Sequence, residues 1–165
     1  RPTGIRDDAG RCRNERLFKY MYGSTPAEVR KQLVKVPWNG SYVLFSKVNG
    51  AAAALAAVNR ELQQHPELKK YLVSSGTFNW RYIRGTKRLS SHAFATAIDI
   101  GVAKYADYWK NSGLSEASTQ LVYRNRMPLE LAKIFEKHGF IWGGYWYHYD
   151  TMHFEYHPEI IAANP

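Results

Sequence analysis

The chain has 165 residues, a formal net charge of +9 and a single cysteine. This length suits one domain with a proper core and is too short for two comfortable ones. The lone Cys12 excludes an intrachain disulfide framework and a cysteine-rich metal site, so a metal would have to be held by histidines and carboxylates. The longest apolar stretch, about residues 51–58, is far shorter than the roughly 20 residues that cross a bilayer, so we expect no membrane span.

The basic charge predicts attraction to anionic surfaces. Nucleic acid is the usual partner of such a chain, but the basic residues are scattered and form neither a dedicated basic helix nor a zinc-finger pattern. We therefore expect no nucleic-acid partner. Aromatic residues make up 15% of the chain, which predicts that several of them line a surface groove instead of filling the core.

Helix signals dominate the first half of the chain. Thr25 is the expected N-cap of a helix that starts at Pro26 and has Glu28 as its capping-box acid; Pro37 ends it. Asn49 is the expected cap of an alanine-rich second helix. In chain order, these signals predict a helix over 25–36, a turn over 38–41, a strand over 42–45, a helix over 49–64 and a short helical piece over 67–71.

Strand signals dominate the second half. The strand expected over 97–102 has Asp99 on the face opposite Ile98 and Ile100, because side chains alternate along a strand. The apolar spacing over 128–137 predicts a helix, with Gly139 beyond its end. The remaining predictions are a turn at 75–76 and strands over 140–142, 145–149 and 152–156.

Helices that come first and strands that cluster late indicate an α+β fold, with a small antiparallel sheet flanked by helices. We divide the chain into residues 1–48, an N-terminal extension or subdomain packed on the core, and residues 49–165, the core itself. Together they are expected to form one compact domain.

Two segments carry the residues of a metal site. Residues 90–99 read Ser-Ser-His-Ala-Phe-Ala-Thr-Ala-Ile-Asp and contain His92 and Asp99; far downstream, Asp150 stands three positions before His153. Two imidazoles and one carboxylate suit zinc and leave one tetrahedral position for water. A further carboxylate beside that water is what metal-assisted hydrolysis needs as its general base.

The first segment resembles the S-x-H-x-x-G-x-A-x-D signature of the M15 peptidases, and the second resembles their acid-x-x-His motif. That family includes D-alanyl-D-alanine carboxypeptidases and dipeptidases and L-alanyl-D-glutamate endopeptidases. The resemblance extends over about residues 76–156. It implies the M15 (hedgehog/DD-peptidase-like) fold and one zinc ion per chain, with His92, Asp99 and His153 as ligands and Asp150 as the general base.

One position departs from the family signature, because the family's glycine is Ala95 here. A glycine at this position serves either a backbone with positive φ, which disfavours alanine, or only the need for a small side chain beneath the metal. We favour the second interpretation because everything around Ala95 matches.

The base needs a bend in the chain. On a straight strand His153, Glu155 and His157 share one face and Asp150 lies on the other. Asp150 therefore reaches the metal only if the chain bends or bulges near Thr151. Glu155 is the alternative base, and Asp150 is alternatively a fourth ligand or a partner of a ligand histidine; the motif spacing favours Asp150 as base.

Further residues are candidates for substrate contact. The resemblance implies an arginine upstream of the first motif that stabilises the developing oxyanion, and Arg81 fits that place best. Arg84 is the alternative, and either arginine could bind a substrate carboxylate as a bidentate fork. His148 and His157 compete for a ligand role, but their aromatic surroundings favour packing or substrate contact. The candidate substrate-binding residues are Arg84, Ser90, Trp146, His148 and Tyr149.

These features predict a zinc metallopeptidase that hydrolyses peptidoglycan stem peptides, as a carboxypeptidase or an endopeptidase. The alternative is a non-catalytic peptidoglycan-binding module that keeps the zinc fold. The chain begins at Arg1 and not at Met, so we expect a periplasmic or secreted protein whose export signal has been removed. Besides peptidoglycan peptides, a protein inhibitor or targeting partner is left open.

Overall fold

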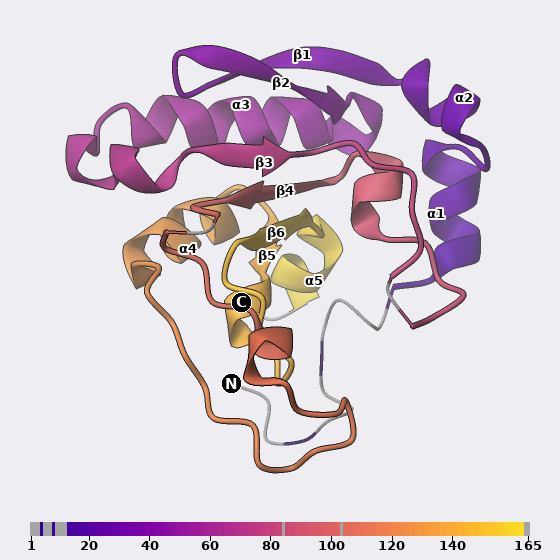
Figure 1. The fold of residues 1–165 in the computed structure, drawn as a ribbon. Coiled ribbons are helices and arrows are strands. Elements are labelled where there is room, and N and C mark those ends of the chain that lie inside the picture. The colour runs from indigo at the N-terminus through magenta and orange to yellow at the C-terminus, as the bar shows by residue number, and fades with distance from the viewer. Residues whose placement is uncertain (1–3, 5–7, 9–12, 84, 103, 164–165) are drawn as a thin grey trace.

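The computed structural model describes residue 4, residue 8 and the ranges 13–83, 85–102 and 104–163. Its fold is α+β, as predicted, but it contains two antiparallel sheets instead of one (Figure 1). Cys12 and Arg84 lie outside the described residues. The helices and strands are α1 (Glu15–Tyr22), α2 (Pro26–Arg30), β1 (Leu33–Trp38), β2 (Ser41–Ser46), α3 (Ala51–Leu62), β3 (Ser74–Gly76), β4 (Ala97–Ile100), α4 (Leu129–Lys137), β5 (Phe140–Trp142), β6 (His153–Tyr156) and α5 (Pro158–Ala163).

The smaller sheet is the β1–β2 hairpin, and it corrects the helix predicted over 25–36. Thr25 does cap α2, since its hydroxyl accepts a hydrogen bond from the Glu28 N–H at 3.2 Å. The helix nevertheless ends at Arg30. The next residues alternate in burial along β1, and the turn residues Asn39 and Gly40 both have positive φ, at 46° and 80°. Asn-Gly in this conformation is the preferred two-residue hairpin turn, and it was read only as a generic turn.

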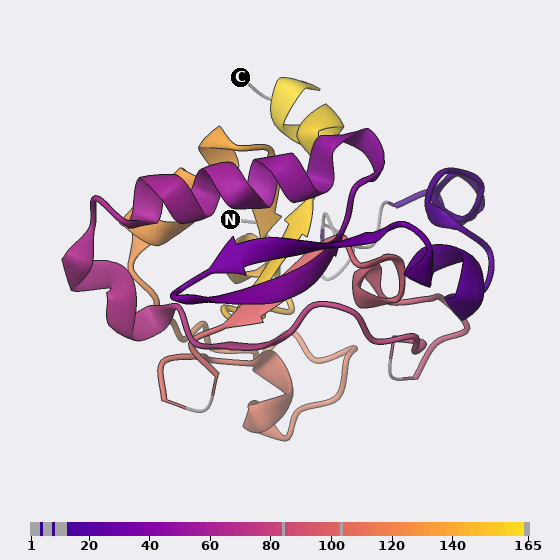
Figure 2. The ribbon, with the colours of Figure 1, turned by 90° about the horizontal axis from the view of Figure 1, so that it is seen from above.

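Helix α3 runs alongside the hairpin (Figure 2). Its apolar face, with Leu55 and Val58 fully buried, packs into one large core with the hairpin, α4 and the inner face of the second sheet. The helix predicted over 49–64 is therefore confirmed, but the prediction of Asn49 as its N-cap is wrong. Asn49 itself has a φ of 53°, and the residue at the N-cap is Gly50 in the left-handed region.

The four-stranded sheet has the order β3-β4-β6-β5 with antiparallel neighbours. Ile98 and Ile100 of β4 are buried in the core, and Asp99 lies on the opposite face, as expected. In register, Asp99 pairs with Gly76 of β3 and with His153 of β6. The sheet therefore places a carboxylate and an imidazole side by side on its outer face.

Two local predictions in this half are wrong. Residues 74–76 form the edge strand β3 and not a turn, and residues 145–149 form no strand. The chain from Gly143 to Tyr145 is a 3₁₀ helix that leads into a loop. The predicted strands over 140–142 and 152–156 and the helix over 128–137 are confirmed as β5, β6 and α4.

A second, smaller apolar cluster joins the N-terminal part of the chain to the 3₁₀ turn Ser91–Phe94. Phe18 and Tyr22 of α1 pack there with Phe94, and the Phe18 and Phe94 ring centroids are 5.5 Å apart. The described residues before 49 thus contribute to both apolar clusters. The division at residue 48 stays a prediction. None of the described helices has the length and apolar character of a membrane span.

Candidate active site

The two sequence motifs meet on the outer face of the four-stranded sheet. His92 comes from the 3₁₀ turn Ser91–Phe94, Asp99 from β4 and His153 from the start of β6. The His153 Nδ1 atom lies 2.8 Å from Asp99 Oδ1, and His92 Nε2 lies 3.2 Å from both Asp99 Oδ2 and His153 Nδ1. The structure therefore brings together the three residues predicted as ligands, each offering one atom toward a common point.

The opposite nitrogen of each histidine has a fixed acceptor. His92 Nδ1 is 3.0 Å from the Thr77 carbonyl oxygen, and His153 Nε2 is 2.8 Å from Glu155 Oε1. Acceptors there hold the N–H on the outer side of each ring, so that the inner nitrogens present lone pairs. Two lone pairs 3.2 Å apart repel each other unless a proton or a cation lies beside them. Two imidazoles and a carboxylate with supported tautomers fit zinc.

Asp99 and His153 shift each other's pKa values. Burial opposes ionisation of Asp99, but hydrogen bonds from His153 and His92 outweigh it and hold the pKa of Asp99 well below its usual value. Burial likewise opposes the charged form of His153, yet Asp99 and Glu155 raise the pKa of His153 well above 6.5. A cation bound by the inner nitrogen would compete with the proton that this raised pKa favours on His153.

Asp150 lies just before β6, at a turn. Thr151 and Met152 form the turn that the sequence required, and the Asp150 carbonyl accepts a hydrogen bond from the His153 N–H at 3.2 Å. The Thr151 hydroxyl accepts from the Asp107 N–H at 2.7 Å, which anchors this turn. A side chain at Gly143 would meet the Asp150 carbonyl at 2.6 Å, so only glycine permits this close approach.

The Asp150 carboxylate has the properties of a general base. Its Oδ1 atom is buried and has no hydrogen-bond partner among the described residues. Burial raises the pKa of Asp150 to about 6; the nearby charge of Asp99 adds to the rise and that of His153 opposes it. A carboxylate with one free oxygen and a raised pKa is suited to taking a proton from water.

Glu155, the alternative base, is already engaged. Its carboxylate accepts hydrogen bonds from His153 Nε2 at 2.8 Å, from His157 Nε2 at 3.0 Å and from the Ser91 hydroxyl. Its position behind His153 favours orienting this ring over activating water. His157 bonds Glu155 on one side and Glu159 on the other, at 2.7 Å. Neither His157 nor His148 offers a nitrogen to the three-residue group.

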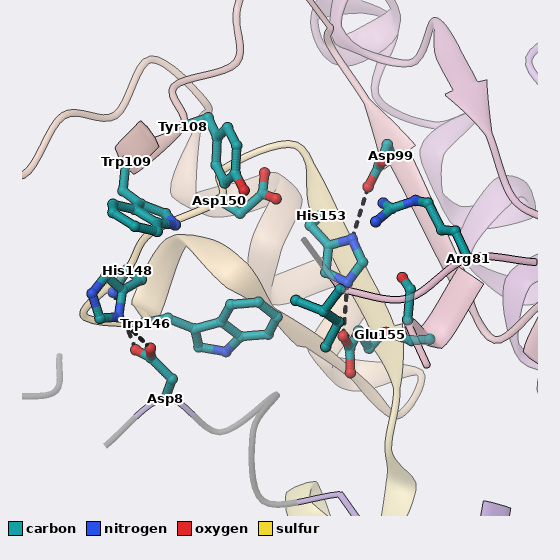
Figure 3. A pocket seen from close by; sticks show the side chains of 13 residues that line it. Asp8, Arg81, Asp99, Tyr108, Trp109, Trp146, His148, Asp150, His153 and Glu155 are labelled. Carbon is teal, nitrogen blue, oxygen red and sulfur yellow. Dashed lines mark hydrogen bonds and ion pairs between the residues drawn. The ribbon is translucent and has the colours of Figure 1, made fainter. Parts of the chain in front are cut away.

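Two pockets adjoin at this group. Figure 3 shows the one with more empty space in all, about 740 Å³ including its open mouth against about 420 Å³ for the other, and we call these two the larger and the smaller pocket. Arg81 and Asp99 line both pockets; the Arg81 side chain is exposed and its guanidinium reaches toward the site (Figure 3). Trp146 lies along the larger pocket, with its ring centroid 5.5 Å from that of His153. Ser90 also lines this pocket, and its hydroxyl accepts from the His92 N–H at 3.3 Å.

The other predicted substrate contacts have different surroundings. His148 lines the larger pocket, but its ring packs at a tilt against Trp109, with ring centroids 4.5 Å apart, and bonds the carboxylate of Asp8 at 2.7 Å. Tyr149 is buried against Tyr123 and lines neither pocket. Arg84 lies outside the described residues. Asp8 and Trp109 were missed because no local sequence pattern marks them.

The favoured interpretation of Ala95 is wrong. Its φ of 52° and ψ of 40° place it in the left-handed region, where it ends the 3₁₀ turn that carries His92. Its N–H donates to the His92 carbonyl at 3.1 Å, and its carbonyl accepts from Ser46 at 2.9 Å. The family's glycine thus matches a backbone requirement, and alanine here costs about 1–2 kcal/mol of conformational energy.

An imidazole–imidazole–carboxylate group beside a further carboxylate is an arrangement that metal-dependent hydrolases use. Residues 84–156 match the model of the family described as D-alanyl-D-alanine carboxypeptidase, within the M15 peptidases. This range holds both motifs, and over it the match confirms the resemblance to the M15 peptidases. Neither the comparison with curated proteins nor that with solved structures found a match.

Proposed function

We propose that the protein is a zinc-dependent peptidase that hydrolyses amide bonds of bacterial peptidoglycan stem peptides. His92, Asp99 and His153 would hold one zinc ion. When bound, zinc supplies Lewis acidity that polarises the scissile carbonyl and makes water a better nucleophile at neutral pH. The observation that carries the proposal is the Asp150 carboxylate next to this three-residue group, whose buried Oδ1 atom has no hydrogen-bond partner among the described residues.

Asp150 acts as the general base and then as the general acid. Its carboxylate takes a proton from the attacking water and passes this proton to the nitrogen of the leaving amine. The raised pKa, about 6, lets it do both near neutral pH. Burial next to the turn at Thr151 keeps the carboxylate fixed, which lowers the cost of orienting it during reaction.

Arg81 stabilises the negative charge that develops on the carbonyl oxygen. It lines both pockets and is exposed, and it forms no ion pair with a described side chain. A guanidinium at the junction of the pockets can donate to an oxyanion formed there. Ser90 and Trp146 support the site from the larger pocket: Ser90 by holding the turn of His92, Trp146 by shaping the wall beside His153.

The substrate class rests on the family match and on charge. The matched family is described by its activity on D-alanyl-D-alanine, and a net charge of +9 favours the anionic cell wall. Such a substrate places the protein in the periplasm or outside the cell. Peptidoglycan peptides are the partner that the proposal requires, and an inhibitor or targeting protein would add regulation.

The test is digestion of purified peptidoglycan by zinc-loaded protein, chelator-treated protein and the Asp150→Asn variant, with released fragments read by mass spectrometry. Fragments that depend on both zinc and Asp150 support the proposal. Zinc-loaded protein that binds the wall but releases nothing supports the alternative of a non-catalytic binding module.

A further inference from the structure

The two pockets at the site differ in chemistry. The larger one is lined by the rings of Tyr108, Trp109 and Trp146 and by the carboxylates of Asp8 and Asp150. Figure 3 shows these side chains on the side of His153 away from Arg81. The smaller pocket is lined by short polar residues and glycine at the end of β3: Ser75, Gly76, Thr77 and Asn79.

Asp150 fixes the direction in which a peptide would lie. It lines the larger pocket and not the smaller one. Because Asp150 delivers the proton to the leaving amine, the residue that departs as an amine must occupy the larger pocket. The acyl part of the peptide then extends over the smaller pocket, past the exposed residues Ser75 and Gly76 of the edge strand.

The larger pocket offers no receptor for a terminal carboxylate among the described residues. Among the lining residues that the structure describes, Arg81 is the only lysine or arginine, and it stands at the junction with the smaller pocket. The ring nitrogens of His148 are engaged, Nδ1 with Asp8 at 2.7 Å and Nε2 with the Glu116 carbonyl at 2.9 Å. Arg88 lines neither pocket, and its guanidinium donates to the Arg13 carbonyl at 2.7 Å.

The same lining is suited to a cation. An ammonium group is attracted to the faces of tryptophan and tyrosine rings and to carboxylates, and both kinds of group line this pocket. A carboxylate would be repelled by Asp150 there, and Asp8 and Glu155 already accept hydrogen bonds from histidines and would not receive it. The pocket therefore selects by charge for the residue whose amine departs.

We propose that the protein is an endopeptidase whose larger pocket takes a diamino-acid residue of the stem peptide, with its side-chain ammonium among the aromatic rings. The inference rests on the proposed function and narrows it. The bond broken is the amide between the γ-carboxyl of D-glutamate and the α-amine of the diamino acid. Water adds its oxygen to the carbonyl carbon, and its proton goes through Asp150 to the departing amine, so the products are one acid and one amine.

The test uses four synthetic pentapeptides based on L-Ala-γ-D-Glu-L-Lys-D-Ala-D-Ala. One pair has lysine and the other norleucine, which removes only the ammonium; each pair is made with a free and with an amidated C-terminus. We expect cleavage between D-Glu and lysine at either C-terminus, and a kcat/KM roughly tenfold lower with norleucine. Asp8→Asn should reduce the preference for lysine severalfold, a ratio that an overall loss of folded protein would not change.

Three results overturn the inference. Release of the terminal D-alanine from the free acid only would show a carboxypeptidase. Cleavage between L-Ala and D-Glu, or equal kcat/KM for lysine and norleucine, would show that the larger pocket does not select a cation. If none of the peptides and no peptidoglycan is cleaved by zinc-loaded protein, the proposed function itself fails, and this outcome is distinct from cleavage at another bond.

Discussion

Replacing Glu155 by glutamine tests whether the residue behind His153 orients this ring for metal binding. The carboxylate accepts from His153 Nε2 at 2.8 Å, from His157 Nε2 at 3.0 Å and from the Ser91 hydroxyl, and it is only 4% exposed. Glutamine keeps the shape but turns one acceptor oxygen into an NH₂ donor, which faces another donor. The amide oxygen takes the Oε1 position, where His153 and Ser91 both donate, and the NH₂ faces His157. His153 then keeps only a neutral acceptor and loses the charged one that fixes its tautomer.

The expected loss of zinc affinity follows from what hydrogen-bond partners of ligand histidines contribute at metal sites. Losing the partner of a ligand histidine typically lowers metal affinity 10- to 100-fold, which corresponds to about 1.4–2.7 kcal/mol. We expect Glu155→Gln to weaken zinc binding by this factor. A mismatched buried donor also costs about 1–3 kcal/mol of folding free energy, so the variant should unfold at lower denaturant concentration.

The assay is competition for zinc between the protein and a chelating dye, at a temperature where both proteins are folded. Glu159→Gln is the matched control, because Glu159 bonds only the far side of His157 and its side chain is 63% exposed. We expect that control to change zinc affinity less than about twofold, as for a residue one partner further from the metal. If Glu155→Gln binds zinc as tightly as the parent, the orienting role is refuted.

Three further predictions concern single residues. Asp150→Asn should lower kcat/KM about 10²- to 10⁴-fold with the zinc content unchanged, as atomic absorption would show. The rate of the parent protein should fall as the pH drops below about 6, where the Asp150 base is protonated. An equal rate in the parent and the variant would remove Asp150 from the mechanism. The free energy of unfolding of Ala95→Gly should lie within about 1 kcal/mol of that of the parent, because relief of the positive φ offsets the lost methyl group. Ala95→Val should lose more than about 2 kcal/mol of unfolding free energy. Equal stability of all three proteins in urea would contradict backbone strain at this position. Burial opposes the charged form of His157, but Glu155 and Glu159 outweigh it and raise the pKa of His157. The stabilising contribution of His157 is therefore complete below pH 6.5 and is lost as the pH rises through the raised pKa. The stability advantage of the parent over His157→Gln in urea should shrink from pH 6 to pH 9, and a constant advantage would contradict this account.

The residues of the three-residue group could be predicted because their signal is local. His92 and Asp99 lie within ten residues of each other, and Asp150 and His153 within four. The alternation along β4 also predicted that Asp99 faces away from Ile98 and Ile100. The bend at Thr151 followed from strand geometry alone, since a straight strand would have turned Asp150 away.

The features of the fold and site that the sequence did not predict depend on contacts between distant parts of the chain or on backbone conformation. Asp8 bonds His148 across 140 positions, and no spacing rule connects two such residues. The pattern of residues 33–38 fits a helix face until the Asn-Gly turn pairs them with β2, so tertiary pairing overrode the helix signal. The positive φ of Ala95 was misjudged because alanine tolerates this conformation only when the surrounding turn imposes it.

The most direct test of the central claim is a zinc titration of metal-free protein that follows bound zinc and stem-peptide hydrolysis together. We predict that hydrolysis is absent without zinc, rises in proportion to bound metal and levels off at one equivalent. Asp99→Ala should lose both tight zinc binding and hydrolysis. Hydrolysis that persists in chelator-treated protein, or tight zinc binding that survives in Asp99→Ala, would contradict the account.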